Sequence, residues 1–250
     1  MDRLVAEQTF HDQQALHRAV TFDLRPELLQ VDDEAYLRHE SWIRYAFKVL
    51  GDIHGLPILD LGCGHAMAAV VLARRGALVT ALDLSAAYLS EARRRAGANS
   101  VHLNLLQANG ERLPFADSSF DRVWGHAILH HLDLAIAAPE LRRVLRPGGI
   151  AAFCEPWGEN PLLNAARRWL PYRGKGRTPD EQPLRRRDID KLRQVFSKVE
   201  VSGFQLFGML GRAMPVGRLR CPLESWDHLL LRQLPVLKRL CRYVVIEVRG

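Results

Sequence analysis

A short glycine-rich turn constrains this chain more than any other feature. Residues 58–61 form an apolar run that contains Asp60, and Gly62 and Gly64 follow it before a helical pattern that starts at Met67. Glycine lacks a Cβ and tolerates positive φ, so a strand–turn–helix unit of this kind lets the backbone approach a bound cofactor closely. A dinucleotide fingerprint would carry a third glycine at position 67, and its absence points away from a nicotinamide cofactor.

Strand and helix patterns alternate through the middle of the chain. Apolar runs predict strands at residues 58–61, 78–82, 101–106, 120–125 and 149–154. Helical patterns lie at residues 67–75, 86–96 and 139–145, and a turn is expected at 146–149. Later residues predict one more helix and two closing strands, at 188–196, 199–207 and 243–248. Such alternation predicts an α/β fold with a doubly wound, mostly parallel sheet.

The segment before the sheet has a helical pattern. Apolar residues recur at spacings of three and four over residues 36–50, which predicts one amphipathic helix. We therefore divide the chain into an N-terminal helical cover, residues 1–55, and a domain at residues 56–250. The stretch 155–187 is rich in proline and glycine, and we expect it to form an arm or lid within that domain.

Composition limits the class of protein. No run approaches the ~20 apolar residues of a membrane helix, and the N-terminus lacks the layout of a secretory signal. The four cysteines form no C-x-x-C pair, which disfavours a zinc site and favours buried, reduced thiols. We therefore expect a cytoplasmic chain with no transmembrane segment and no metal.

The net charge of +7 is unevenly distributed. Basic residues gather in and around the expected arm: Arg167, Arg168, Arg173, Lys175, Arg177 and Arg185–Arg187. A solvated basic surface explains this pattern, and peripheral contact with a membrane or with an anionic substrate stays open. No RNA-binding motif accompanies the charge, so no nucleic-acid partner is expected. The sequence does not determine the oligomeric state.

Four motifs carry a family resemblance. They are D-L-G-C-G at residues 60–64, N-G-E-R-L-P-F at 109–115, W-G-H-A-I-L-H-H-L at 124–132 and P-G-G at 147–149. Together they resemble class I S-adenosylmethionine (SAM)-dependent methyltransferases of the small-molecule group, over roughly residues 56–157. The resemblance implies a Rossmann-like, seven-stranded sheet in which the last strand runs antiparallel and is inserted near the edge.

The resemblance also implies where SAM would bind. Asp60, Gly62, Cys63 and Gly64 would hold its amino-acid end, and Leu84 would pack on the adenine. Asp83 ends the second predicted strand, 23 positions after Asp60, where an acid commonly accepts hydrogen bonds from ribose hydroxyls; capping of the next helix is the alternative for this residue. Three residues of the second motif would face the adenine edge: Asn109, Gly110 and Glu111.

Asn109 departs from the family pattern. The family usually has an aspartate at this position, which accepts from the adenine amino group. An amide oxygen can accept the same hydrogen bond, so we expect adenine binding to survive with modest loss. A simple turn asparagine is the alternative.

Several residues are candidates for the chemistry. Histidine titrates near neutrality, so His126 at the end of the fourth strand, His130 and His131 are candidate bases, and Glu155 is another. His126 could instead contact the cofactor, and His130 and His131 could simply pack at the end of the sheet. Aromatic and histidine side chains could line the acceptor pocket, with core packing as the alternative for each: His11, Tyr36, Trp42, Tyr45 and Trp157.

The leading interpretation is a SAM-dependent methyltransferase that acts on a small molecule, with oxygen favoured over nitrogen or carbon, and with a biosynthetic role. Methylation of a lipid or quinone at a membrane surface is one alternative. A SAM-binding regulatory protein without activity is another, and a nicotinamide oxidoreductase is a distant fourth. Loop residues set the acceptor in this group, so the sequence does not name it.

Overall fold

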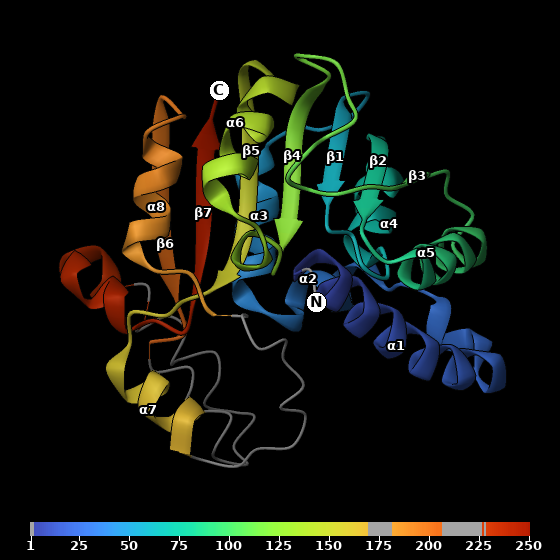
Figure 1. Cartoon of the computed structure of the whole chain (residues 1–250), viewed down its shortest axis with the longest axis horizontal. Coiled ribbons are helices and arrows are strands. Elements are labelled where there is room, and N and C mark those ends of the chain that lie inside the picture. The colour runs from blue at the N-terminus through green and yellow to red at the C-terminus, as the bar shows by residue number, and fades with distance from the viewer. Residues whose placement is uncertain (1–2, 170–181, 207–226, 228) are drawn as a thin grey trace.

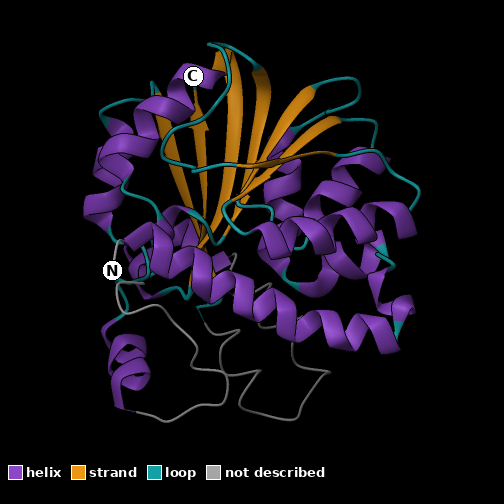
Figure 2. Ribbon diagram, turned by 45° about the vertical axis from the view of Figure 1, so that its right-hand side comes forward, coloured by secondary structure: helices purple, strands orange, loops and turns teal. Residues whose placement is uncertain are grey.

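The protein forms one seven-stranded sheet with helices on both faces (Figures 1 and 2). A computed structural model describes residues 3–169, 182–206, 227 and 229–250. The strands are β1 (Pro57–Leu61), β2 (Leu78–Asp83), β3 (Asn104–Gln107), β4 (Phe120–His126), β5 (Leu145–Pro156), β6 (Lys198–Phe204) and β7 (Tyr243–Arg249). Their order in the sheet is β3-β2-β1-β4-β5-β7-β6.

Strand direction follows the expected pattern. Neighbours from β3 to β5 pair in parallel, whereas β7 runs antiparallel to both β5 and β6. The predicted doubly wound sheet is thus confirmed, and so is the antiparallel strand inserted beside the edge. The order reverses between β1 and β4, and open α/β sheets bind ligands outside the strand ends at such a reversal.

Two apolar layers bury the sheet. The α-helices are α1 (Arg3–Leu24), α2 (Asp33–His39), α3 (Ser41–Leu50), α4 (Met67–Arg74), α5 (Ala86–Ala98), α6 (Leu134–Val144), α7 (Pro161–Trp169) and α8 (Arg186–Arg193). Side chains of α2 to α5 pack on one face of the sheet, and side chains of α6 and α8 pack on the other. Successive strand residues point to opposite faces: Ile58 packs in the first layer and Leu59 in the second.

The N-terminal helices differ from the single amphipathic helix predicted over residues 36–50. The chain forms α2 and α3 instead, because Glu40 between them is extended, with φ −140° and ψ 139°. Glu40 is buried and accepts a hydrogen bond from Gln205 Nε2 at 3.2 Å. Periodicity alone could not show this break, because apolar residues continue on both sides of it. The helix α3 packs on β5 and β7, so it belongs to the layers around the sheet.

The helix α1 lies outside these layers. It crosses the carboxyl ends of the parallel strands, and the arrowhead of β4 points towards α1 and α2 (Figure 1). Polar contacts fasten it to α5: Asp12 Oδ1 accepts from Ser85 Oγ at 2.5 Å, and Arg18 binds Glu91 at 3.1 Å. Helix α1 therefore covers the end of the sheet where ligands bind in this fold class.

The boundaries of some elements differ slightly from the predicted ones. Strand β3 begins at Asn104 rather than at residue 101, and α6 begins at Leu134, five positions before the predicted start. Residues 146–149, where a turn was expected, lie within β5. Leu145 pairs with Phe120 and Ile150 with Arg122, so these residues form a bulge in the ladder.

Part of the expected arm lies outside the described residues. Helix α7 and a bridge between Trp157 and Leu184 are described, whereas Arg173, Lys175, Arg177 and most of the loop at 177–184 fall within residues 170–181. Cys154 and Cys241 are buried as expected, but Cys63 is only partly buried. Within the described ranges, the helices are too short or too polar to cross a bilayer.

Candidate cofactor and acceptor site

Two cavities open at the carboxyl ends of β1, β2 and β4. The first, here called the α1 cavity, has a volume of about 200 Å³ and has α1 as one wall. The second, here called the α2 cavity, has a volume of about 610 Å³ and has α2 as one wall. Four residues line both cavities: Gly62, Gly64, His65 and His126. The glycine turn and the end of β4 thus form the border between two parts of one site.

Most of the predicted cofactor residues lie in this site. The α1 cavity is lined by Asp83, Leu84, Asn109 and Gly110, and the α2 cavity by Asp60 and Cys63. The predicted residue Glu111 lines neither cavity. Its carboxylate accepts hydrogen bonds from Arg3 and from the Asp133 backbone at 2.6 Å, so it anchors the start of α1 and of α6.

Asp60 is an unusual group in the α2 cavity wall. It is 2% exposed, and its Oδ2 has no hydrogen-bond partner among the described residues. Burial, together with the charge of Asp83, raises the pKa of Asp60 to about 8. Trp124 pairs with Asp60 in the sheet, and its buried Nε1 also lacks a partner within the described part of the chain. The wall therefore contains one buried acceptor and one buried donor whose hydrogen bonds no described residue satisfies.

Asp83 ties the glycine turn to the next helix. Its Oδ2 accepts from Gly64 N at 2.7 Å, and its Oδ1 accepts from Ser85 N at 2.8 Å. Ser85, rather than Asp83, caps α5 by accepting from Tyr88 N. Burial raises the pKa of Asp83, and these backbone donors oppose the shift. Each carboxylate oxygen keeps a further lone pair, so Asp83 can still accept from hydroxyl groups in the α1 cavity.

Asn109 faces the α1 cavity but also stabilises its own loop. Its Oδ1 accepts from Glu111 N at 2.9 Å, which is the turn role considered as the alternative to base recognition. An amide oxygen accepts two hydrogen bonds, so this contact leaves one for a ligand.

Gly62 is required by both conformation and space. Its φ is +66°, and a Cβ at this position would lie 2.5 Å from Ile128 Cδ1. Gly64 also has positive φ, +49°, but its Cβ would meet nothing within 4 Å. Of these two glycines, only Gly62 packs closely against the segment after β4.

This difference predicts unequal costs for two alanine substitutions. We expect Gly62→Ala to lower the free energy of unfolding by about 2–4 kcal/mol, because left-handed strain and overpacking add. Gly64→Ala should cost only the strain, about 1–2 kcal/mol. Denaturant unfolding of the two variants measures both values, and equal losses would contradict the close packing of Gly62 on Ile128.

The catalytic candidates separate into two groups. His126 lies at the end of β4 on the border of both cavities. Burial lowers the pKa of its imidazole, with the Glu155 carboxylate opposing the shift. Glu155 itself is fully buried and accepts from Ile128 N at 2.9 Å, Leu129 N at 2.7 Å and pairs with His130 Nδ1 at 2.7 Å. Glu155 and His130 thus fix the segment after β4, and neither lines a cavity.

The acceptor candidates are also divided. Tyr36 lines the α2 cavity and His11 lines the α1 cavity. Three others line neither. Trp42 is 2% exposed and stacks on Tyr243 at 4.2 Å; Tyr45 hydroxyl lies 3.1 Å from Ser202 Oγ; and Trp157 is buried in the layer that contains α8. Core packing explains these three residues.

Sequence reasoning missed several residues of the site. The α1 cavity is also lined by Glu7, Gln14, His65 and Tyr88, and the α2 cavity also by His39. His131, a candidate base from the sequence, lines the α1 cavity as well. A signal was available for α1, since Glu7, His11 and Gln14 lie four and three residues apart and so share one helix face. Nothing local could show that this face closes on strand ends far away in the sequence.

Comparisons with known proteins agree with this geometry. Residues 59–153 match the model of a family described as a methyltransferase domain. The chain is 43% identical over 97 residues to malonyl-[acyl-carrier protein] O-methyltransferase of Enterobacter lignolyticus, which covers 38% of this chain and 37% of the relative. It is 32% identical over 158 residues to demethylmenaquinone methyltransferase of a Mycobacterium species (strain JLS), covering 62% and 64%.

Solved structures support the fold. Geranyl diphosphate C-methyltransferase from Streptomyces coelicolor, in complex with Mg²⁺, geranyl diphosphate and S-adenosylhomocysteine, superposes with a TM-score of 0.57 at 18% identity. The match covers 82% of this chain and 77% of that one. The chain spans 37% and 64% of the lengths of the two curated relatives named above. The family match over residues 59–153 and the sheet order together show a methyltransferase domain with the class I, Rossmann-like fold.

Proposed function

We propose that the protein transfers a methyl group from SAM to a small-molecule acceptor. One observation carries this proposal: the two cavities meet at Gly62, Gly64 and His126, at the carboxyl ends of β1 and β4. A donor that lies across this border would have its adenosine on one side and its methionine end on the other. The transferred methyl group would then be close to the α2 cavity, where an acceptor has room.

The unpartnered atoms of the site fit such a donor. Asp60 Oδ2 suits an ammonium group, and Trp124 Nε1 suits an acceptor atom. Asp83 has lone pairs left for ribose hydroxyls, and Leu84 and Asn109 would flank a base. When bound, SAM supplies an electrophilic methyl group and leaves as a neutral thioether. The chain therefore has to align the reactants rather than stabilise a new charge. Alignment can lower the activation barrier by roughly 7–11 kcal/mol.

His126 is the residue best placed to accept a proton from the acceptor. Its lowered pKa keeps the imidazole neutral near pH 7, which is the form that acts as a base. Oxygen acceptors benefit most from such a base, so we favour transfer to oxygen and a biosynthetic role. The α2 cavity mixes polar and apolar walls, Tyr36, His39, Ile43 and Met67 among them, which suits a partly apolar acceptor.

A quinone acceptor is the second candidate. It is favoured by the 32% identity of this chain to demethylmenaquinone methyltransferase, which acts on a quinone as its name states. The α2 cavity would take a flat ring, and a hydrophobic tail would have to leave through its mouth. A SAM-binding regulator without catalytic activity is the third candidate. An assay that measures both binding and turnover distinguishes it from the two enzymes.

The test combines binding with turnover. Calorimetry should detect S-adenosylhomocysteine binding to the purified chain, and no heat with either SAM or this product would refute the proposal. A panel of carboxylic acids, phenols and quinones, with S-adenosylhomocysteine release as the readout, then identifies the acceptor class. Tight binding with no turnover on any class would favour the regulator.

The role of His126 makes a separate prediction. His126→Ala should lower kcat by about 10²–10⁴-fold on an oxygen acceptor, because the base is lost, with little change in S-adenosylhomocysteine affinity. His102→Ala, an exposed position outside both cavities, serves as the control. Equal losses in kcat and affinity would instead make His126 a cofactor contact.

A further inference from the structure

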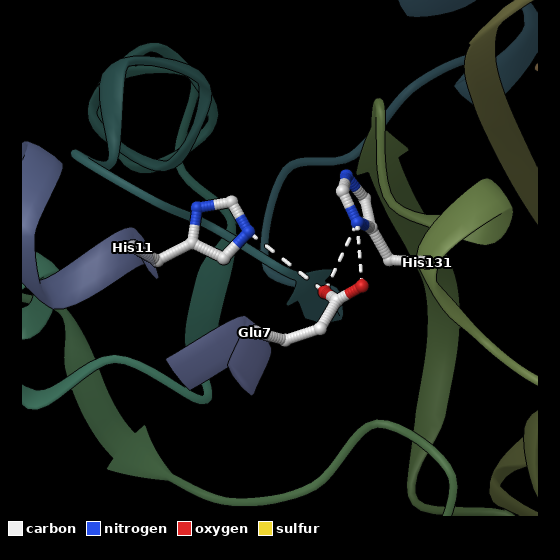
Figure 3. Close-up of side chains that lie close together, drawn as sticks. All are labelled: Glu7, His11 and His131. Carbon is white, nitrogen blue, oxygen red and sulfur yellow. Dashed lines mark hydrogen bonds and ion pairs between the residues drawn. The ribbon is translucent and has the colours of Figure 1, made fainter. Parts of the chain in front are cut away.

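Three side chains that the proposed methyl transfer does not use meet in the wall of the α1 cavity (Figure 3). Glu7 and His11 come from successive turns of α1, and His131 comes from the segment after β4. Glu7 Oε2 lies 3.0 Å from His131 Nδ1 and 3.9 Å from His11 Nε2. All three groups offer one ligand atom within 4.8 Å of the others.

We propose that Glu7, His11 and His131 bind one divalent transition-metal ion of the zinc type. Two imidazoles and one carboxylate suit Zn²⁺, Fe²⁺, Co²⁺ and Ni²⁺, whereas Mg²⁺ and Ca²⁺ prefer oxygen alone. Ligands at about 2.0–2.2 Å from a tetrahedral ion lie roughly 3.5 Å from one another. Glu7 Oε2 lies 3.0 Å from His131 Nδ1 and 3.9 Å from His11 Nε2, on either side of this value, so small side-chain rotations would bring the atoms to this spacing and leave the fourth position to water.

The surroundings of His11 support this assignment. A metal-bound histidine usually has its other ring nitrogen fixed by an outer oxygen or water. His11 makes a side-chain hydrogen bond with Gln14, and Gln14 Oε1 accepts from the Tyr88 hydroxyl at 3.1 Å. The ring of His11 is therefore held with Nε2 towards Glu7, as Figure 3 shows.

An ion at this position would join distant parts of the fold. Residues 7 and 11 belong to the helix that covers the sheet end, and residue 131 follows β4 by a few positions. The ion would fasten α1 over the α1 cavity without touching the glycine turn. The ligands belong to the chain itself, so the ion would bind whether or not the chain transfers methyl groups.

Direct metal binding tests the site. The full chain is treated with a chelator, and Zn²⁺ is then titrated by calorimetry in the absence of SAM. We expect one ion per chain with micromolar or tighter affinity, no binding of Mg²⁺, and a visible absorption spectrum with Co²⁺ typical of nitrogen–oxygen coordination. Zinc should also slow amide hydrogen exchange within residues 3–24.

Matched variants identify the ligands. Glu7→Gln, His11→Ala and His131→Ala should each weaken Zn²⁺ binding about 100-fold or more, and Gln14→Ala about tenfold, as loss of an outer partner does. His17→Ala serves as the control, because His17 is exposed on the same helix and outside the cluster. Thermal unfolding in chelator shows whether each variant is folded. If the alanine variants are not folded, Glu7→Gln still tests the site, because it keeps the shape of the side chain.

Two results would overturn the site. One is the absence of stoichiometric Zn²⁺ binding in the wild-type chain. The other is equal Zn²⁺ affinity in the wild-type, His11→Ala and His131→Ala proteins. In either case the three residues form only a hydrogen-bonded latch between α1 and the segment after β4. S-adenosylhomocysteine binding, measured in chelator, reports separately on the proposed function, so the two failures are distinguishable.

Discussion

Replacing Asp83 by alanine is expected to weaken S-adenosylhomocysteine binding by at least about 100-fold. Two ribose hydroxyls facing one buried carboxylate form charge-assisted hydrogen bonds, each contributing about 1.5–3 kcal/mol, and 1.4 kcal/mol corresponds to a factor of ten. Asp83 is 9% exposed and faces the α1 cavity. In the alanine variant, water would therefore be a poor substitute for the lost carboxylate as a hydrogen-bond acceptor. Calorimetry at fixed pH and salt measures the loss.

A structural effect has to be separated from this loss, because Asp83 also accepts from Gly64 N and Ser85 N. A ligand analogue without the ribose 2′-hydroxyl makes the separation. The penalty of Asp83→Ala should shrink by about tenfold or more on the analogue, since part of the contact is already missing. Near-wild-type affinity of Asp83→Ala, or an identical penalty on both ligands, would refute the ribose role.

Replacing Asp60 by asparagine should change both binding and stability, with opposite signs. The pKa of Asp60 is about 8 in the ligand-free fold, so the group is protonated at neutral pH. An ammonium group beside it favours the carboxylate, and binding should therefore release a proton at pH 7. Affinity should rise with pH up to about 8 and then level off. The asparagine variant should bind more weakly and lose this pH dependence.

The stability prediction follows from the same pKa. The native pKa of about 8 lies above the ordinary value of 3.8, so between these values the folded chain holds a proton that the unfolded chain has released. The contribution of Asp60 to stability is thus fully present below pH ~4 and is lost as pH rises towards 8. At 1.36 kcal/mol for each pKa unit, Asp60→Asn should be more stable than wild type at pH 8 by up to about 5 kcal/mol, and it should gain little at pH 4.

Calorimetry in buffers of different ionisation enthalpy measures the released proton, and denaturant unfolding at pH 4 and pH 8 measures the stability. Asp52→Asn, an exposed acid in the turn before β1, is the control. A wild-type affinity that stays flat between pH 6 and 8, with no proton release, would show that Asp60 does not face a cation.

The sequence predicted the sheet more reliably than the site. Alternating apolar runs are local, and β1, β2, β4 and β5 lie within a few residues of their expected ranges because both faces of a central parallel strand are buried. The break at Glu40 was missed because apolar residues continue on both sides of it, and its hydrogen-bond partner Gln205 lies 165 positions away. Helix boundaries were least accurate where a side-chain cap such as Asp133 decides the start.

Within the site, residues on the glycine turn and at strand ends were predictable because topology places them. Asp60, Gly62, Asp83 and His126 line the cavities for this reason. The roles of aromatic residues were not predictable, since Trp42 and Tyr36 share one helical pattern yet only Tyr36 faces a cavity. The partners of Glu155 were not predictable, because the amides of Ile128 and Leu129 that it binds come from another strand connection.

The position of β7 has a consequence for truncated chains. Strands β5 and β6 do not touch each other, since β7 separates them and supplies the hydrogen bonds to both. Until residues 243–249 are free to pair, one edge of β5 stays open and β6 has no neighbouring strand. Chains truncated before residue 243 should therefore self-associate and be cleaved by protease more readily than the full chain.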